Sequence, residues 1–358
     1  MKSLIRVLSV DDSAFFRKVL TDILGRDGDI DLVGCANDPY EARDQLLSFP
    51  VDVLTLDLEL PRMAGLTFLK LIMERKPMPV IVLSCLTPTG SRKAVEALIA
   101  GAFAVIEKPK SLSNRQSFDE KLIKGIKSAA AAQLGHRRPA LLNRCHRSRQ
   151  LPVSTFDPRQ IIALGASTGG TQALEEVLAM LPANLPGIVV VEHIPASFSA
   201  SFAARLNQVC AMEVREAKNG DIVHPGLALI APGDQHMEVH WVGNHYRVRL
   251  HDGPLVEHQR PSVDVLFDSL ARCAGSHTVA ALLTGMGKDG AAGMKRLHDL
   301  KARTLAQDAR SSVVYGMARK AVELQAVDSI VSLKNIAGEI VKALETHKSR
   351  IPLTSYAY

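Results

Sequence analysis

Short apolar runs alternate with amphipathic stretches along most of the chain. Up to residue 132, five apolar runs predict buried strands at residues 4–10, 32–36, 51–56, 80–84 and 104–106. Stretches with helical spacing follow them at residues 14–26, 40–48, 66–74, 91–100 and 118–132. Strict alternation of strand and helix predicts an α/β fold, with a parallel sheet covered by helices on both faces. Functional sites in such sheets lie at the carboxyl ends of the strands.

A second alternating series runs from Gln160 to about Leu344. Its expected strands are residues 161–164, 188–192, 227–231, 278–283 and 304–307. Residues 236–241 and 246–250 are expected to form an antiparallel hairpin through Gly243-Asn244. This pattern predicts a second, doubly wound and Rossmann-like α/β domain that carries a β-hairpin.

The stretch between the two series has the composition of a linker. Five arginines and no acidic residue occur from His136 to Arg149, and prolines stand at positions 139 and 152. We therefore expect a first domain at residues 1–127, a basic linker at 128–156, a second domain at 157–346 and a tail at 347–358.

Charge and composition exclude several classes of partner. The formal net charge of the 358 residues is +6, and setting aside the five linker arginines leaves +1. The basic surplus therefore belongs to the linker, which argues against nucleic acid as a partner. With no bilayer-length apolar run and no secretory signal, we expect a cytoplasmic protein without membrane insertion. The five cysteines are scattered, so we expect reduced thiols rather than disulfides or a zinc site.

Polar side chains gather where the strands of the first domain end. Asp11 and Asp12 follow the first strand, and Asp57 ends the third. Converging carboxylates repel one another unless a hard cation such as Mg²⁺ lies between them. Ser84 and Lys108 end the fourth and fifth strands, where a hydroxyl and an ammonium can bind phosphoryl oxygens. Taken singly, each acid is also compatible with a solvated cap at a strand end.

A glycine-rich turn opens the second domain. Gly165–Gly170 follows an apolar strand and precedes a helix at residues 171–181, so Ser167 is raised out of the core beside free backbone N–H groups. Those features are typical of an acyl-transfer nucleophile, although a serine there can also be only a helix cap. His193 follows the next strand as candidate base, and Asp289 follows a later strand as the acid that orients it.

The segment around Asp289 supports a competing interpretation. Gly285-x-Gly287-x-x-Gly290 opens a helix after a strand and matches the dinucleotide-binding fingerprint, with Asp308 after the next strand as a ribose-binding acid. Against this interpretation, Asp289 puts a carboxylate where the pyrophosphate would lie. An NAD(P)-binding oxidoreductase is therefore the alternative function, and a non-enzymatic scaffold is the second.

The first domain resembles a response-regulator receiver domain. The segments that carry the resemblance are Val10–Ser13, Thr55–Pro61, Ser84 and Lys108-Pro109. The resemblance implies a flavodoxin-like fold with a parallel five-stranded sheet. It also implies that Asp57 accepts phosphate from a chemotaxis histidine kinase and that Ser84 and Lys108 are switch residues.

The same resemblance implies a metal site and reveals one departure. The Mg²⁺ ligands would be Asp11, Asp12, Asp57 and the backbone of Glu59. The family usually has an aspartate before Gly65, where this chain has Ala64. That change affects the local turn rather than the phosphate chemistry.

The second domain resembles the chemotaxis protein-glutamate methylesterase/glutaminase family. The matching segments are Gly165–Gly170, Glu192–Pro195, Ala231–Gly233, Pro261–Asp264 and Leu283–Gly290. The resemblance implies that Ser167 attacks a methyl ester or amide on methyl-accepting chemoreceptors, with His193 as base and Asp289 as its orienting acid. Backbone N–H groups near His193 and Met286 would stabilise the oxyanion, Thr168 would shape the pocket, and the hydrolase site would need no cofactor.

The family's architecture implies regulation by the first domain. In the resembling proteins the receiver packs over the catalytic cleft, and phosphorylation loosens this intramolecular contact. The chain departs from the family at Glu192, where glutamine is usual, at Ala309-Arg310 and at Ala318. These changes leave the three candidate catalytic residues in place.

Overall fold

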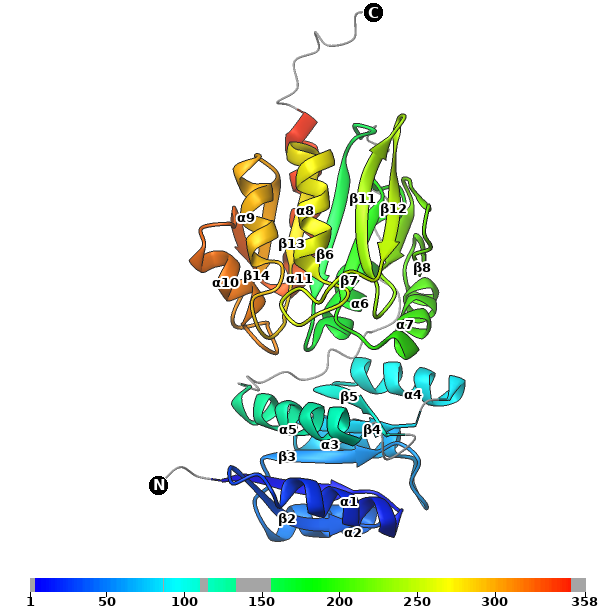
Figure 1. Ribbon diagram of the computed structural model, residues 1–358, viewed down its shortest axis with the longest axis vertical. Coiled ribbons are helices and arrows are strands. Elements are labelled where there is room, and N and C mark those ends of the chain that lie inside the picture. The colour runs from blue at the N-terminus through cyan, green and yellow to red at the C-terminus, as the bar shows by residue number, and fades with distance from the viewer. Residues whose placement is uncertain (1–3, 86, 110–114, 133–155, 349–358) are drawn as a thin grey trace, which may run out of the picture. The chain divides into compact units, whose positions relative to one another are not determined.

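The computed structural model describes residues 4–85, 87–109, 115–132 and 156–348. The chain divides into two compact units, Met1–Leu141 and Leu142–Tyr358 (Figure 1). Helix α5 (Arg115–Ala131) continues into the expected linker, and most of that linker, with its arginines, lies outside the described residues. The expected domain boundaries stay a prediction.

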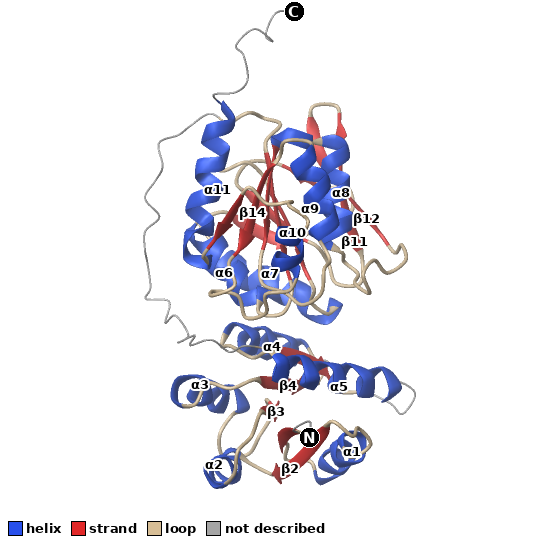
Figure 2. Cartoon of the chain, turned by 90° about the vertical axis from the view of Figure 1, so that its left-hand side faces the viewer, coloured by secondary structure: helices blue, strands red, loops and turns tan. Residues whose placement is uncertain are grey.

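The first unit is built on a five-stranded parallel sheet, as predicted. Its strands are β1 (Ile5–Val10), β2 (Ile30–Ala36), β3 (Val53–Asp57), β4 (Val80–Ser84) and β5 (Ala104–Glu107). They lie in the order β2-β1-β3-β4-β5. Helices on both sides of the sheet bury β3 and β4 completely (Figure 2). Parallel strands covered in this way are nearly continuous apolar runs, which is why the sequence predicted them well.

The helices of this unit begin in different ways. They are α1 (Ala14–Leu24), α2 (Pro39–Ser48), α3 (Gly65–Arg75), α4 (Pro88–Ile99) and α5. Ser13 caps α1 by accepting from the Phe16 N–H, and Asp38 caps α2 in the same manner. The cap residue of α3 is Ala64, which offers no side-chain acceptor. The first turn of α3 therefore lacks a stabilising contact that polar caps provide.

The second unit contains a seven-stranded parallel sheet in its described residues. Its strands are β6 (Ile161–Ala166), β7 (Ile188–Glu192), β8 (Glu213–Glu216), β10 (Leu227–Ile230), β13 (Thr278–Leu282), β14 (Arg303–Gln307) and β15 (Ser329–Val331). The order is β15-β14-β13-β6-β7-β10-β8. The first strand, β6, thus lies between β7 and β13, and successive strands extend to either side of it. Doubly wound sheets bind ligands at such a switch point.

Six α-helices accompany this sheet in the described part of the second unit. They are α6 (Gly170–Met180), α7 (Ala196–Val209), α8 (Val263–Cys273), α9 (Ala291–Asp299), α10 (Met317–Glu323) and α11 (Leu333–Lys348). Figure 2 shows α6 and α11 on one side of the sheet and α8 and α9 on the other. The expected doubly wound architecture is confirmed.

The expected hairpin is also confirmed, as part of a small separate sheet. Strands β11 (His236–Val242) and β12 (His245–His251) pair antiparallel, and β9 (Ile222–Val223) pairs with β12. The hairpin lies beside α8 (Figure 1), and the Val239 N–H donates to Ser269 Oγ of α8 at 2.9 Å. Strands β8, β9 and β15 were not predicted. β8 reads Glu-Val-Arg-Glu, and the other two have two or three residues, so none forms an apolar run.

Candidate active site

Ser167 follows β6 at the switch point of the large sheet. The turn continues through Gly169, whose φ of 77° is left-handed and whose added Cβ would lie 2.6 Å from Val313. Only glycine fits this position without strain. The Ser167 N–H donates to the Thr284 carbonyl at 3.0 Å, which ties the turn to the loop after β13. Ser167 itself is half-buried.

His193 lies beside this turn because β6 and β7 are in register. Ala166 pairs with Glu192, so Ser167 and His193 each follow a paired position. The His193 N–H donates to the Ala166 carbonyl at 3.3 Å. These backbone contacts place candidate nucleophile and candidate base on neighbouring strand ends.

The third candidate, Asp289, contacts the imidazole directly. Its Oδ2 lies 2.8 Å from His193 Nε2, and both side chains are at least 95% buried. Because an ionised carboxylate only accepts hydrogen bonds, Nε2 must carry the proton in this pair. His193 Nδ1 is then the basic nitrogen. It is buried and has no hydrogen-bond partner in the described residues, and no hydrogen bond joins it to Ser167 there.

The start of α8 holds the carboxylate of Asp289 in place. Asp289 accepts from Ser262 Oγ at 2.7 Å, from the Val263 N–H at 2.7 Å and from the Asp264 N–H at 3.0 Å. Burial alone would raise the pKa of Asp289, but the bonds from His193 and these donors outweigh burial and lower it. Asp289 is therefore a fixed anion that faces the imidazole.

The loop after β13 carries Met286 and contacts Thr168. The Gly285 carbonyl accepts from the N–H groups of Gly316 and Met317 at 3.1 and 3.0 Å, so the loop is anchored just before the exposed Met286. Thr284 Oγ1 donates to the Thr168 carbonyl at 2.9 Å. The anchored loop and the serine turn thus form one connected backbone surface.

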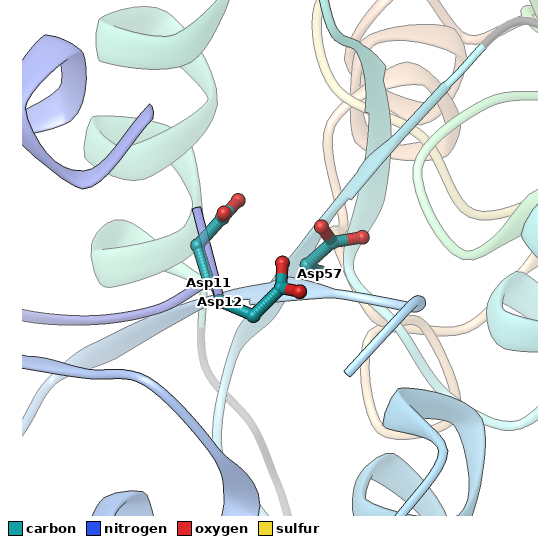
Figure 3. Close-up of side chains that lie close together, drawn as sticks. All are labelled: Asp11, Asp12 and Asp57. Atoms are coloured by element: carbon teal, nitrogen blue, oxygen red, sulfur yellow. The ribbon is translucent and has the colours of Figure 1, made fainter. Parts of the chain in front are cut away.

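The acidic residues of the first unit meet as expected. One oxygen from each of Asp11, Asp12 and Asp57 lies within 4.8 Å of the others (Figure 3). Lys108 Nζ lies 2.6 Å from both Asp11 Oδ2 and Asp57 Oδ2. Hard oxygen donors from three acids suit Mg²⁺, so the residues present fit the expected ion.

Burial and charge act in opposite directions in this pocket. Burial raises the pKa of Asp11, and the nearby Lys108 only partly offsets it. Burial alone would lower the pKa of Lys108, but the charges and hydrogen bonds of Asp57 and Asp11 prevail and raise it. Lys108 is therefore held as a cation between the two carboxylates.

Ser84 and Glu59 lie near Asp57 at the carboxyl ends of the strands, as expected from the sequence. Ser84 follows Leu83, which pairs with Asp57. The Ser84 carbonyl accepts from the Lys108 N–H at 2.9 Å. The Glu59 N–H donates to Asp57 Oδ1 at 3.0 Å. An added Cβ on Gly65 would lie 2.1 Å from the Asp57 carbonyl, so this position needs glycine.

Comparison with known proteins identifies the family. The CheB methylesterase family matches residues 162–340, and the response-regulator receiver domain family matches residues 7–116. Protein-glutamate methylesterase/protein-glutamine glutaminase 2 of Syntrophus aciditrophicus is 45% identical over 340 residues, which are 95% of this chain and 99% of that protein. This chain belongs to the CheB methylesterase family.

Two further relatives agree with this assignment. The protein-glutamate methylesterase/protein-glutamine glutaminase of Salmonella typhimurium is 43% identical over 95% of this chain and 97% of its own. The crystal structure of the CheB methylesterase catalytic domain of Thermotoga maritima superposes with a TM-score of 0.50 at 34% identity, covering 51% of this chain and 97% of that one.

The contacts of this CheB methylesterase family member also oppose the NAD(P) interpretation. The N-terminus of α9, where pyrophosphate would bind, is capped by Asp264, which accepts from the Gly293 N–H at 2.6 Å. Burial, aided by the nearby charge of Asp289, raises the pKa of Asp264 to about 6. Asp308 accepts from Ser311 N–H and Oγ within its own turn rather than facing a ligand site.

Glu192, which departs from the CheB methylesterase pattern, points away from solvent. Its Oε2 is buried without a partner in the described residues and would lie 2.2 Å from a Cβ added to Gly170. Burial raises the pKa of Glu192 well above its ordinary range. The carboxyl group is packed under the start of α6, where burial favours its protonated form.

Sequence reasoning gave no role to Ser262, Asp264 or Thr284. All three are buried and hold the loops that carry Ser167 and Asp289. The signal available was a serine directly before an amphipathic helix, which predicts an N-cap but not its contact with Asp289.

No helix in the described part of the chain is long and apolar enough to cross a bilayer.

Proposed function

We propose that this chain is a protein-glutamate methylesterase and protein-glutamine glutaminase that uses Ser167, His193 and Asp289. The observation that carries the proposal is the 2.8 Å contact between His193 Nε2 and Asp289 beside the Ser167 turn. It leaves Nδ1 of a neutral imidazole free to accept a proton, as a general base requires. The names of the relatives supply the substrate class.

The reaction divides into two steps. In the first, Ser167 Oγ attacks the γ-carbonyl carbon of a glutamyl methyl ester or of glutamine while His193 Nδ1 takes the hydroxyl proton. His193 returns that proton to the leaving group as the carbon–oxygen or carbon–nitrogen bond breaks, which releases methanol or ammonia. In the second step, water deprotonated by His193 hydrolyses the acyl-enzyme and yields glutamate.

Fixed groups around the serine support the charged states of this reaction. Asp289 stabilises the imidazolium that forms when His193 takes the proton. The backbone N–H of Met286 is proposed to bind the oxyanion, and such a donor is worth about 3 kcal/mol in comparable enzymes. The N–H groups of His193 and Ile194 already donate to the carbonyls of Ala166 and Glu192, so the donor expected near His193 is engaged elsewhere. Thr168 is proposed to shape the adjoining pocket.

The proposed substrates are the cytoplasmic domains of methyl-accepting chemoreceptors, so the proposed location is the cytoplasm. The proposed phosphodonor is a chemotaxis histidine kinase, and Asp57 is the acceptor because its carboxylate lies among Asp11, Asp12 and Lys108. Bound Mg²⁺, held by these three acids and the Glu59 carbonyl, would neutralise charge on the phosphoryl group. Ser84 and Lys108 would sense the phosphate, and its presence would release the esterase from restraint by the first unit.

Methanol release from methylated chemoreceptor membranes tests the esterase. We expect release by the intact chain and none by Ser167→Ala, while Ser201→Ala on α7 serves as a matched control that retains activity. Absence of release by the unmodified chain, even with a small phosphoryl donor, would contradict the proposal.

The regulatory part is tested separately. A small phosphoryl donor should raise the rate of methanol release by the intact chain but not by Asp57→Asn. Equal rates with and without the donor would disprove activation through Asp57 and leave the esterase proposal standing.

A further inference from the structure

A buried chain of hydrogen bonds extends from Asp289 into the hairpin sheet. Ser262 donates its hydroxyl proton to Asp289 Oδ1 at 2.7 Å, and the Ser262 N–H donates to Nδ1 of His236 at 3.2 Å. His236 Nε2 lies 2.9 Å from the Pro254 carbonyl. His236 is 1% exposed and belongs to β11, so it is neither a surface residue nor part of the large sheet.

These contacts allow a single protonation state of His236. A carbonyl oxygen only accepts, so Nε2 must carry the proton toward Pro254. A backbone N–H only donates, so Nδ1 must keep its lone pair toward Ser262. Burial independently lowers the pKa of His236, which agrees with a neutral ring. The histidine is thus an oriented acceptor for the residue that begins α8.

The start of α8 is the support on which Asp289 depends. Three of the hydrogen bonds that Asp289 accepts come from the consecutive residues 262–264. A shift of this segment would move all three donors together and turn the carboxylate away from His193. Misplacement of a supporting group by about 1 Å can cost a hundredfold in rate.

We propose that His236 is a positioning residue for the Ser-His-Asp site, acting through the Ser262 N–H on the carboxylate of Asp289. On this proposal the hairpin is part of the catalytic support rather than an appendage. The inference rests on the proposed esterase activity, since it concerns the orientation of that reaction's acid.

Two amide substitutions, each of which keeps a polar atom at one of the two ring-nitrogen positions, separate positioning from packing. In His236→Asn, the amide oxygen lies where Nδ1 was and can still accept from Ser262, while the bond to Pro254 is lost. In His236→Gln, the amide nitrogen can still donate to Pro254, while the acceptor for Ser262 is lost. His240→Gln on the same strand is a control, because its half-exposed ring contacts Glu238 and not Ser262.

We expect His236→Gln to lower kcat for methanol release at least tenfold with KM changed less than twofold. His236→Asn should recover most of that loss, and His240→Gln should match the unmodified chain. The midpoint temperature of thermal unfolding should fall by similar amounts in both His236 variants, since each loses one buried hydrogen bond. Equal losses of kcat in the two variants, or an unchanged kcat in His236→Gln, would overturn the proposal.

A second readout does not depend on turnover. The low-field proton resonance of His193 Nε2, bonded to Asp289, should move or broaden in His236→Gln and remain in His236→Asn. An unaltered resonance in both variants would also overturn the proposal. If the unmodified chain releases no methanol, the esterase proposal fails, and this resonance still decides whether His236 positions Asp289.

Discussion

Asp289 is the residue on which the candidate site converges. It accepts one hydrogen bond from His193 and three from residues 262–264, and these bonds lower its pKa despite burial. An amide in its place would keep one acceptor oxygen and turn an NH₂ group toward N–H donors. The position therefore requires a carboxylate rather than any polar group.

We accordingly expect Asp289→Asn to lower kcat by about 10³- to 10⁴-fold, because the neutral side chain neither holds the imidazole proton nor stabilises an imidazolium. KM should change little. Methanol release at saturating substrate is the measurement, with thermal unfolding as a control for loss of structure. Activity within tenfold of the unmodified chain would remove Asp289 from the mechanism.

Glu192 is an acidic residue whose buried position disfavours the ionised form of its carboxyl group. Burial raises its pKa in the folded chain above the unfolded value of about 4.3. At pH values between the two pKa values, the carboxyl group of Glu192 is therefore protonated in the folded chain and ionised in the unfolded chain. The stability contributed by this proton is fully present below about pH 4 and is lost as pH rises toward the folded pKa.

Glu192→Gln, which keeps the shape and cannot ionise, should therefore stabilise the chain increasingly as pH rises above about 4 toward the folded pKa of Glu192. The gain is about 1.4 kcal/mol for each pH unit over which only the unfolded glutamate is ionised. Unfolding midpoints of both proteins across this range measure it. A difference that is independent of pH would show that Glu192 is ionised in the folded chain.

Among the elements, strands that are buried on both faces were predictable and short polar strands were not. β3, β4 and β7 are completely buried, so their sequences are apolar runs. β8 has one buried residue in four and lies at the edge of the sheet, so tertiary pairing alone makes it a strand.

Helix α3 offers an element-scale prediction. Its first turn has no side-chain acceptor because Ala64 occupies the cap position. Ala64→Ser should supply one and stabilise the turn by about 1 kcal/mol. Hydrogen exchange of the first-turn amides of α3 should then slow about fivefold, with Ala64→Val as a control that offers no acceptor. Unchanged exchange in Ala64→Ser would show that the turn is already satisfied.

The whole molecule combines two chemistries in separate units. The acids of the first unit suit a divalent cation, whereas the candidate triad of the second unit is proposed to transfer protons and an acyl group. Both family assignments agree with this division, because each family matches its own unit.

Removal of divalent cations should therefore separate the two chemistries. Chelation is expected to abolish the stimulation of methanol release by a small phosphoryl donor, because Asp57 then lacks its charge-neutralising partner. Basal release should be unchanged, and adding back Mg²⁺ should restore the stimulation. Loss of basal release on chelation would mean that the esterase reaction itself needs a metal ion.

The sequence by itself determined the parts of this protein that depend on local pattern. The strand–turn–helix around Ser167, the acids at strand ends and the parallel architecture follow from runs of apolar residues, glycine turns and motif spacing. Such features are encoded within a few residues, so they can be read without knowing what packs against them.

Only the tertiary structure decided how residues far apart in the chain meet. It determined that His193 turns Nε2 toward Asp289, that Ser262 and His236 support this carboxylate, and that Glu192 points under α6. Each of these contacts is set by side-chain direction and by the distance between elements. Side-chain direction and the distance between elements are not encoded in the spacing of residues along the chain. The sequence therefore predicted which residues are candidates for the chemistry, and the packing of α8 and β11 determined how they are arranged.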